Sequence, residues 1–275
     1  MPIQMNGQNI GAVFYGSTPI REVYLGSEPV WSNLPLVTLT GTTTTAARDQ
    51  LRSAVASYGG NYQTMTKLPF RLDTSSVTNM NSVFSGCAAL TRVPELDTSA
   101  VTDMGSMFLG CAALTRVPEL DTSAVTNMNS MFSGCAALTR VPELDMRKLS
   151  AAGQSGMFRN CSSLTTVPPL NMPNATVSEN MFLNCTSLVT APEITAPKLS
   201  GMIGMYQGCT ALTHVPEMNT ASGTYMNQMF QGCISLTDGN VRCIGKNSGV
   251  STTDMIKNSA LTRLPFYDTN GNWTG

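Results

Sequence analysis

Apolar residues recur along most of this chain with a spacing of about 24 positions. The segment 96–119, LDTSAVTDMGSMFLGCAALTRVPE, returns almost unchanged at 72–95 and 120–143, and in weaker form as far as Pro265. A repeat of this length is one supersecondary unit that cannot bury its apolar face alone, so neighbouring copies have to stack. The pattern therefore predicts one long array of stacked repeats.

Each repeat divides into two predicted elements. Val101, Met104, Met107 and Phe108 stand at i, i+3, i+6 and i+7, a spacing that gives a short helix one apolar face. The following LTRV predicts a strand of about three or four residues, which ends at proline because proline cannot donate to a sheet ladder. Two columns supply the inward strand residues: Leu90, Leu114, Leu138, Leu164, Leu188, Leu212, Leu236 and Leu261, and Val93, Val117, Val141, Val167, Ala191, Val215 and Leu264.

A third column consists only of glycine and asparagine. It precedes each repeated cysteine and comprises Gly86, Gly110, Gly134, Asn160, Asn184, Gly208 and Gly232. These two residue types enter the left-handed backbone region at the lowest cost. The column is therefore predicted to be left-handed and to end the short helix of each repeat.

Two segments precede the array. Residues 1–35 contain short β-branched and aromatic runs that end in Gly-Ser-x-Pro turns, which predicts three or so short strands. So small a module cannot be stable alone, so it should attach to the array, to a copy of itself or to a larger assembly. From Thr42 to Tyr58, good helix formers place Leu51 and Val55 on one stripe, which predicts an amphipathic helix covering the first repeat.

The predicted organisation follows from these segments. Residues 1–35 form a small all-β attachment module, and residues 36–67 form a helical cap that leads into the array. The repeats occupy residues 68–241, and the pattern loosens at 242–275 as expected of a C-terminal capping repeat.

The repeat motif resembles a known family. A strand, a corner, a short helix and a left-handed stop within about 24 residues is the leucine-rich-repeat design. The motif MFxGCxxLTxVPxLDTSxVTxM is similar to the BspA-like leucine-rich repeats of bacterial surface proteins and phage-borne relatives, over about residues 68–265. The predicted fold class is therefore α/β: a leucine-rich-repeat solenoid with a small all-β N-terminal module and a helical N-cap. The alternative is a parallel β-helix, whose coils would contain almost no helix.

A second resemblance concerns residues 10–31. Their VFYGSTPI and VYLGSEPV runs resemble the N-terminal modules of phage minor tail and tail-tip proteins. This resemblance implies attachment to a tail or baseplate protein through residues 1–35, and a location in the virion. The other expected location is an extracellular surface.

Composition excludes several classes of function. Charged residues make up 12% of the chain and the net charge is −1, so no basic face favours nucleic-acid binding. No run approaches the roughly 18 apolar residues of a membrane span. The first ten residues lack a charged segment followed by an apolar one, so no secretion signal is predicted in this chain.

The eight cysteines do not have the spacing of a disulfide framework. Seven follow one another at intervals of 24, 24, 26, 24, 24 and 24 residues, so each has the same place in its repeat. A disulfide framework pairs different places, and a zinc site needs clustered cysteines. The sequence therefore predicts a ladder of buried, reduced thiols, with Cys243 outside it.

The residue before each strand valine is predicted to point outward and is the main candidate for binding. We call these residues the outward column: Arg92, Arg116, Arg140, Thr166, Thr190, His214, Asp238 and Arg263. Three residues after each of its first three arginines stands Glu95, Glu119 or Glu143. One interpretation is a self-compensating charge ladder that keeps the sheet soluble. The other is a binding face whose chemistry changes along the array.

Catalysis and cofactor binding have little support. His214 is the only histidine, and it is predicted on the outer face, away from the cysteines. The carboxylates of Asp73, Asp97, Asp121 and Asp145 are expected to bond to turn amides, since lone aspartates lack the several oxygens that calcium prefers. No phosphate loop or paired metal motif occurs, so no enzyme activity, cofactor or metal is expected.

Three functions remain open at this stage. The first is a phage tail-associated protein that recognises its host, binding a cell-surface protein or glycan through the array. The second is a bacterial surface adhesin of the BspA-like type. The third is a structural spacer without a ligand.

Overall fold

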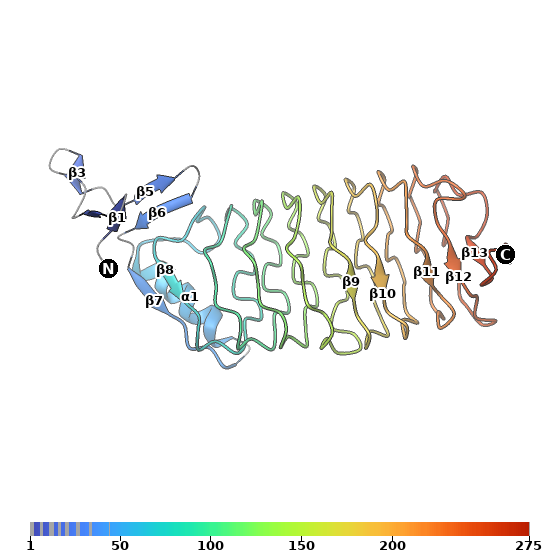
Figure 1. Cartoon of the computed structure of the whole chain (residues 1–275), viewed down its shortest axis with the longest axis horizontal. Coiled ribbons are helices and arrows are strands. Elements are labelled where there is room, and N and C mark those ends of the chain that lie inside the picture. Colours follow the sequence, from blue (N-terminus) through green and yellow to red (C-terminus); the bar gives the residue numbers. More distant parts are fainter. Residues whose placement is uncertain are drawn as a thin grey trace.

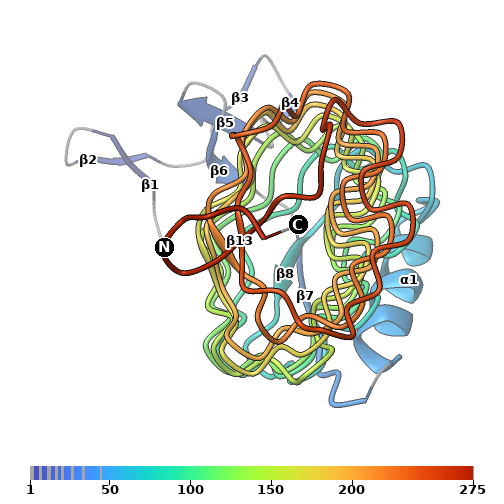
Figure 2. The same cartoon turned by 90° about the vertical axis from the view of Figure 1, so that its right-hand side faces the viewer.

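The structure is a computed structural model. It describes residues 35–274 except Thr44, and within residues 1–34 it describes the backbone of six short strands. The chain winds into coils that stack side by side along one axis, and each coil corresponds to one sequence repeat (Figures 1 and 2).

The strands within residues 1–34 pair two by two. They are β1 (Ile3–Met5) with β2 (Gln8–Ile10), β3 (Phe14–Tyr15) with β4 (Thr18–Pro19), and β5 (Glu22–Leu25) with β6 (Glu28–Ser32), all antiparallel. The prediction of short strands is confirmed, although they form three pairs. The predicted Gly-Ser turns lie outside the described residues.

Helix α1 (Ala46–Ser57) begins near the predicted position and lies at the N-terminal end of the stack (Figure 1). Leu51 and Val55 are fully buried and belong to the same core cluster as the repeats. Strand β7 (Leu36–Thr38) pairs in parallel with β8 (Arg71–Asp73), so the chain before the helix is bonded to the first coil. The helix thus exists as predicted, while its role as a cap remains a prediction.

The coils contain short parallel strands, but not where LTRV predicted them. The strands are β9 (Leu170–Asn171), β10 (Ile194–Thr195), β11 (Met218–Asn219), β12 (Cys243–Ile244) and β13 (Phe266–Tyr267). The strands that belong to the repeats, β9 to β11, come after the proline of the motif, whereas the prediction placed them before it. At the LTRV position only single parallel bridges form, Arg140 with Thr166 and Thr190 with His214. Proline therefore separates a bridge from a two-residue strand in these coils.

The predicted short helix of each repeat is wrong. Between Met104 and Cys111 the chain makes successive β-turns, closed for example by the bond from the Met107 amide to the Met104 carbonyl (3.2 Å). The intervening amides bond to the next coil, as Phe108 N does to the Met131 carbonyl at 2.9 Å. A run of four-residue turns and a helix share the inward spacing i, i+3, i+4, i+7, so the apolar pattern alone could not separate them. The alternative fold, a parallel β-helix, was expected to have coils with almost no helix, and the observed coils share this property.

Two left-handed residues per coil produce these turns. The predicted glycine and asparagine column is confirmed, with φ values such as 72° at Gly110 and 58° at Asn184. A second column, four residues earlier, was not predicted: Ser82, Ser106, Ser130, Gly156, Asn180, Gly204, Gln228 and Asp254. A positive φ at the third position is what a type II turn requires, so the two columns place two such turns in each coil.

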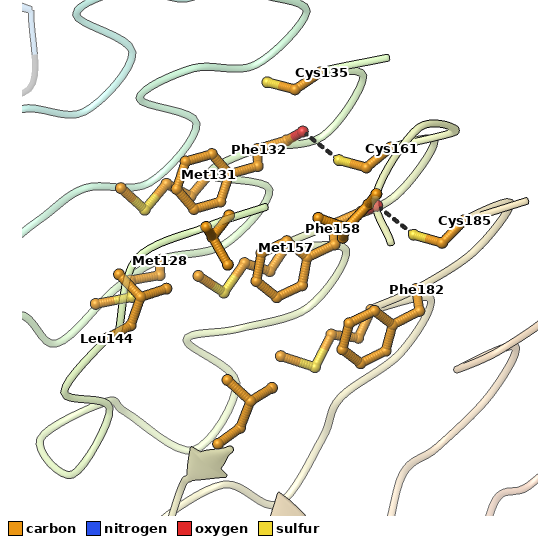
Figure 3. Packing of buried hydrophobic residues seen from close by; sticks show 14 of the residues in the cluster. Met128, Met131, Phe132, Cys135, Leu144, Met157, Phe158, Cys161, Phe182 and Cys185 are labelled. Atoms are coloured by element: carbon orange, nitrogen blue, oxygen red, sulfur yellow. Dashed lines mark hydrogen bonds between the residues drawn. The ribbon is translucent and has the colours of Figure 1, made fainter. Parts of the chain in front are cut away.

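A stack of aromatic rings runs through the core. Seven rings, from Phe84 to Phe230, lie with centroids 5.3 to 5.8 Å apart and nearly parallel planes. Beside them run the methionines and cysteines of the same coils (Figure 3). The predicted inward residues of the central repeat are fully buried, except that Val117 is only half-buried.

Tyr206 is the one residue of this stack with a hydroxyl group. It lies between Phe182 and Phe230, and its hydroxyl is buried without a hydrogen-bond partner. A buried hydroxyl without a partner costs about 1–3 kcal/mol of desolvation free energy. We therefore expect Tyr206→Phe to raise the free energy of unfolding by about 1–2 kcal/mol in urea titrations. A less stable variant would show that the hydroxyl has an acceptor after all.

Candidate functional site

The outward column lies on the surface as predicted. Arg92 is half-buried, and the other candidates are exposed: Arg116, Arg140, Thr166, Thr190, His214, Glu95, Glu119 and Glu143. The two bridges place Arg140 beside Thr166, and Thr190 beside His214, on adjacent coils. On successive coils the chemistry of the column thus changes from arginine through threonine to histidine.

Threonine hydroxyls flanking this column fix the coils on which it stands. Thr115 donates to the Thr91 carbonyl at 3.2 Å and Thr213 to the Val189 carbonyl at 3.1 Å, each bond joining neighbouring coils. Because these hydroxyls are engaged with the main chain, the next residue along, which is the outward column itself, presents the functional group of each coil. The hydrogen bonds between neighbouring coils set the spacing of the column.

The aspartate column has the predicted turn role. Asp97 accepts bonds from the amide and hydroxyl of Ser99 at 3.1 and 2.7 Å, and Asp73 does the same with Ser75. These bonds hold the pKa values of both carboxyl groups below their ordinary value, the serine hydroxyls being the main cause. In the described part of the chain, no group of three or more His, Cys, Asp or Glu side chains is placed to hold a metal ion.

Asp145 differs because it forms a two-pronged ion pair. Its oxygens accept bonds from Arg147 Nε at 3.0 Å and Nη2 at 2.7 Å, and these lower its pKa to about 2. An unfolded aspartate titrates near pH 4, so this pair stabilises the fold above about pH 4 and the stabilisation is lost as the pH falls to about 2.

The variant Asp145→Asn tests this linkage. We expect it to melt below the parent at pH 7, and the difference in melting temperature to shrink as the pH falls from about 4 to 2. Thermal melts across this pH range measure the effect. A difference that does not change with pH would contradict it.

The thiol ladder is confirmed as buried and unpaired. All eight cysteines are free. Each ladder thiol from Cys111 onward donates to the carbonyl of the aromatic residue in the preceding coil, as Cys161 Sγ does to Phe132 O at 3.0 Å (Figure 3). Burial raises the pKa of Cys111 to about 12 and that of Cys87 to about 11, so both stay protonated at neutral pH. His214 is exposed, so the structure does not bring it together with these thiols.

One concave site was not predicted. A cavity of about 350 Å³ lies where α1 ends, lined by Arg52, Ala56, Gly60, Asn61, Tyr62 and Gln63. The Arg52 guanidinium lies 4.9 Å from the centre of the Tyr62 ring, and the Tyr62 hydroxyl donates to the Val83 carbonyl. The Gly59-Gly60-Asn61 turn after the helix is the sequence signal that could have located it.

Two family models match parts of the chain. Residues 60–167 and 91–196 match the family described as Mycoplasma protein of unknown function, DUF285, and residues 154–252 match the BspA type leucine rich repeat region. No curated protein and no solved structure matches the chain. The second match supports the leucine-rich-repeat resemblance over the part that contains Thr166, Thr190 and His214. Neither match reaches residues 1–35.

The described residues contain no helix that is both long and apolar enough to cross a membrane.

Proposed function

We propose that this chain is a non-enzymatic binding protein that meets a cell-surface protein or glycan with the outward column. The BspA-type repeat region indicates a surface or binding protein. The observation that carries the proposal is the outward column from Arg92 to His214, in which Arg92 is half-buried, the other members are exposed and the chemistry changes from coil to coil. Most other repeated positions are engaged in the core, in turns or in bonds between coils.

The setting we propose is a phage tail. In this proposal residues 1–35 attach to a tail or baseplate protein, and the array recognises the host. The support is the resemblance of residues 10–31 to minor tail and tail-tip modules. A bacterial surface adhesin is the second candidate, favoured by the match of residues 154–252 to BspA-type repeats.

Binding to intact bacterial cells tests the proposal, with the full chain compared with residues 35–275. This shorter chain keeps β7 and Leu39, which belong to the first coil and the core. We expect both chains to bind cells equally, and only the full chain to copurify with virions or isolated tails. Binding by neither chain across a panel of cells and glycans would favour a structural spacer.

A further inference from the structure

The cavity where α1 ends is a concave site outside the outward column. It has a volume of about 350 Å³ and is lined by Arg52, Ala56 and the four residues 60–63. That volume lies at the lower end of the range of small-molecule sites, so it can accommodate a small organic compound as well as a single ion. The lining contains one cationic side chain and no carboxylate. Its charge therefore favours an anionic ligand.

Arg52 supplies this charge. Its guanidinium lies 4.9 Å from the centre of the Tyr62 ring, and the Tyr62 hydroxyl donates to the Val83 carbonyl, so the ring that supports the guanidinium is itself held. Contact with an aromatic face leaves the N–H groups of arginine available in the plane of the guanidinium. The Arg52 side chain forms no hydrogen bond or ion pair with any residue between 35 and 274. The guanidinium is thus positioned at the cavity with its donors unfilled.

The segment after the helix adds further donors. The Asn61 side-chain oxygen accepts the amides of Gln63 and Thr64, at 2.8 and 3.3 Å, which leaves the NH2 group of this side chain for a ligand. The main-chain amides of Asn61 and Tyr62 donate to no residue within the described part of the chain. Consecutive main-chain amides in a turn are a recurrent anion-binding arrangement. The lining therefore combines a positive charge with several neutral donors.

Main-chain acceptors in the same region are occupied. At the end of α1 the Val55 carbonyl accepts the Gly60 amide at 2.9 Å, and the Ala56 carbonyl accepts the Gly59 amide at the same distance. The Asn61 carbonyl accepts two amides of its own turn. The negative end of the helix dipole opposes an anion here, but this effect is smaller than that of one hydrogen bond to a charged group. The unfilled donors therefore decide the preference of the cavity.

We propose that this cavity binds the carboxylate or phosphate group of a small organic anion, such as a sugar acid or a sugar phosphate. Arg52 pairs with the anionic group, because its planar fork can make two parallel hydrogen bonds to a carboxylate or a phosphate. The amides of Asn61 and Tyr62 and the side chain of Gln63 bind the remaining oxygens. No residue of the outward column lines the cavity, so this proposal does not rest on the function proposed for that column.

An NMR titration of the full chain, labelled with ¹⁵N, tests the proposal with glucuronate, glucose 6-phosphate and glucose. We expect at least one of the two anions to shift the amide signals of Asn61, Tyr62 and Gln63, with a Kd of about 1 mM or below. Glucose lacks the charge and should bind at least about tenfold more weakly. The tighter of the two anions shows whether the site prefers a carboxylate or a phosphate.

Three variants assign the binding to the cavity. Arg52→Gln removes the charge, and Arg48→Gln is its matched control, because Arg48 lies one turn earlier in α1 and outside the lining. Ala56→Phe keeps Arg52 but fills the cavity, and Ala56 is exposed, so the fold should tolerate the change. We expect Arg52→Gln and Ala56→Phe to weaken binding at least about tenfold, and Arg48→Gln to bind like the parent. Equal melting temperatures would show that all three variants fold.

Four results would overturn the proposal. The first is the absence of shifts at residues 61–63 with either anion up to about 10 mM. The second is glucose binding as tightly as the anions, which would show that charge has no part in recognition. The third is unchanged binding by Arg52→Gln or by Ala56→Phe. The fourth is a set of shifts confined to the outward column, which would place the anion there.

Discussion

Phe158→Ala is expected to lower the free energy of unfolding by about 3–5 kcal/mol. The Phe158 ring lies between Phe132 and Phe182, with centroids at 5.7 and 5.3 Å, and it is fully buried. Its removal leaves a cavity in the middle of the stack, where coils on both sides lose a packing partner. Because each coil contacts only its neighbours, little of this loss can be recovered elsewhere.

Urea unfolding measures the effect, with Phe158→Leu as the control that retains most of the volume. We expect the leucine variant to lose less than half of what the alanine variant loses, since volume-conserving changes in cores are tolerated best. A loss below about 1 kcal/mol for Phe158→Ala would mean that the stack contributes little to stability.

Gly134→Val is the second large effect expected. Gly134 has a φ of 78°, and a Cβ there would lie 3.4 Å from Gly110 Cα and 3.5 Å from Gly110 N. The left-handed backbone alone costs a residue with a side chain about 1–2 kcal/mol, and a β-branched side chain adds crowding against the neighbouring coil. We expect a total loss of about 2 kcal/mol or more.

Two controls separate strain from crowding. Gly110→Val has the same left-handed strain, but a Cβ at Gly110 meets nothing within 4 Å, so its loss should be smaller. Gly134→Asn should lose least, because asparagine occupies this position in two coils, at Asn160 and Asn184. A valine variant at residue 134 that melts like the parent would refute the left-handed turn.

The core and the first left-handed column could be read from the sequence because each coil uses the same residue type at the same place. Cys111 and Leu114 are examples, and both are fully buried. The second left-handed column could not be read, since it contains serine, asparagine, glutamine and aspartate as well as glycine. At Ser106 the hydrogen bonds between coils impose the left-handed backbone conformation, so the residue type there does not indicate it.

The mistaken helix and the misplaced strands have a related cause. Met104, Met107 and Phe108 point inward from a series of turns as they would from a helix, and only the amide partners differ. The observed strands, such as Leu170–Asn171, are two residues long and too short to show an alternating pattern. Bonds between coils, which a single repeat does not encode, decide both features.

The outward column could be located from the sequence because the other positions of each repeat were already assigned to the core, the turns or the proline. Once core, turn and proline positions were assigned, the outward column remained as the candidate for binding, and Arg116 and Arg140 of this column are exposed. The cavity beside Arg52 and Tyr62 could not be located in this way, because it arises where the helix meets the first coil and belongs to no repeat.

The most direct test of the account is binding to intact bacterial cells by a variant with alanine at Arg92, Arg116 and Arg140. A charge-matched control replaces three exposed cations outside the column, Lys148, Arg159 and Lys198. We predict that the column variant loses at least about tenfold in affinity, whereas the control binds like the parent. Equal binding by all three proteins, or equal loss in both variants, would contradict the assignment of the outward column as the binding face.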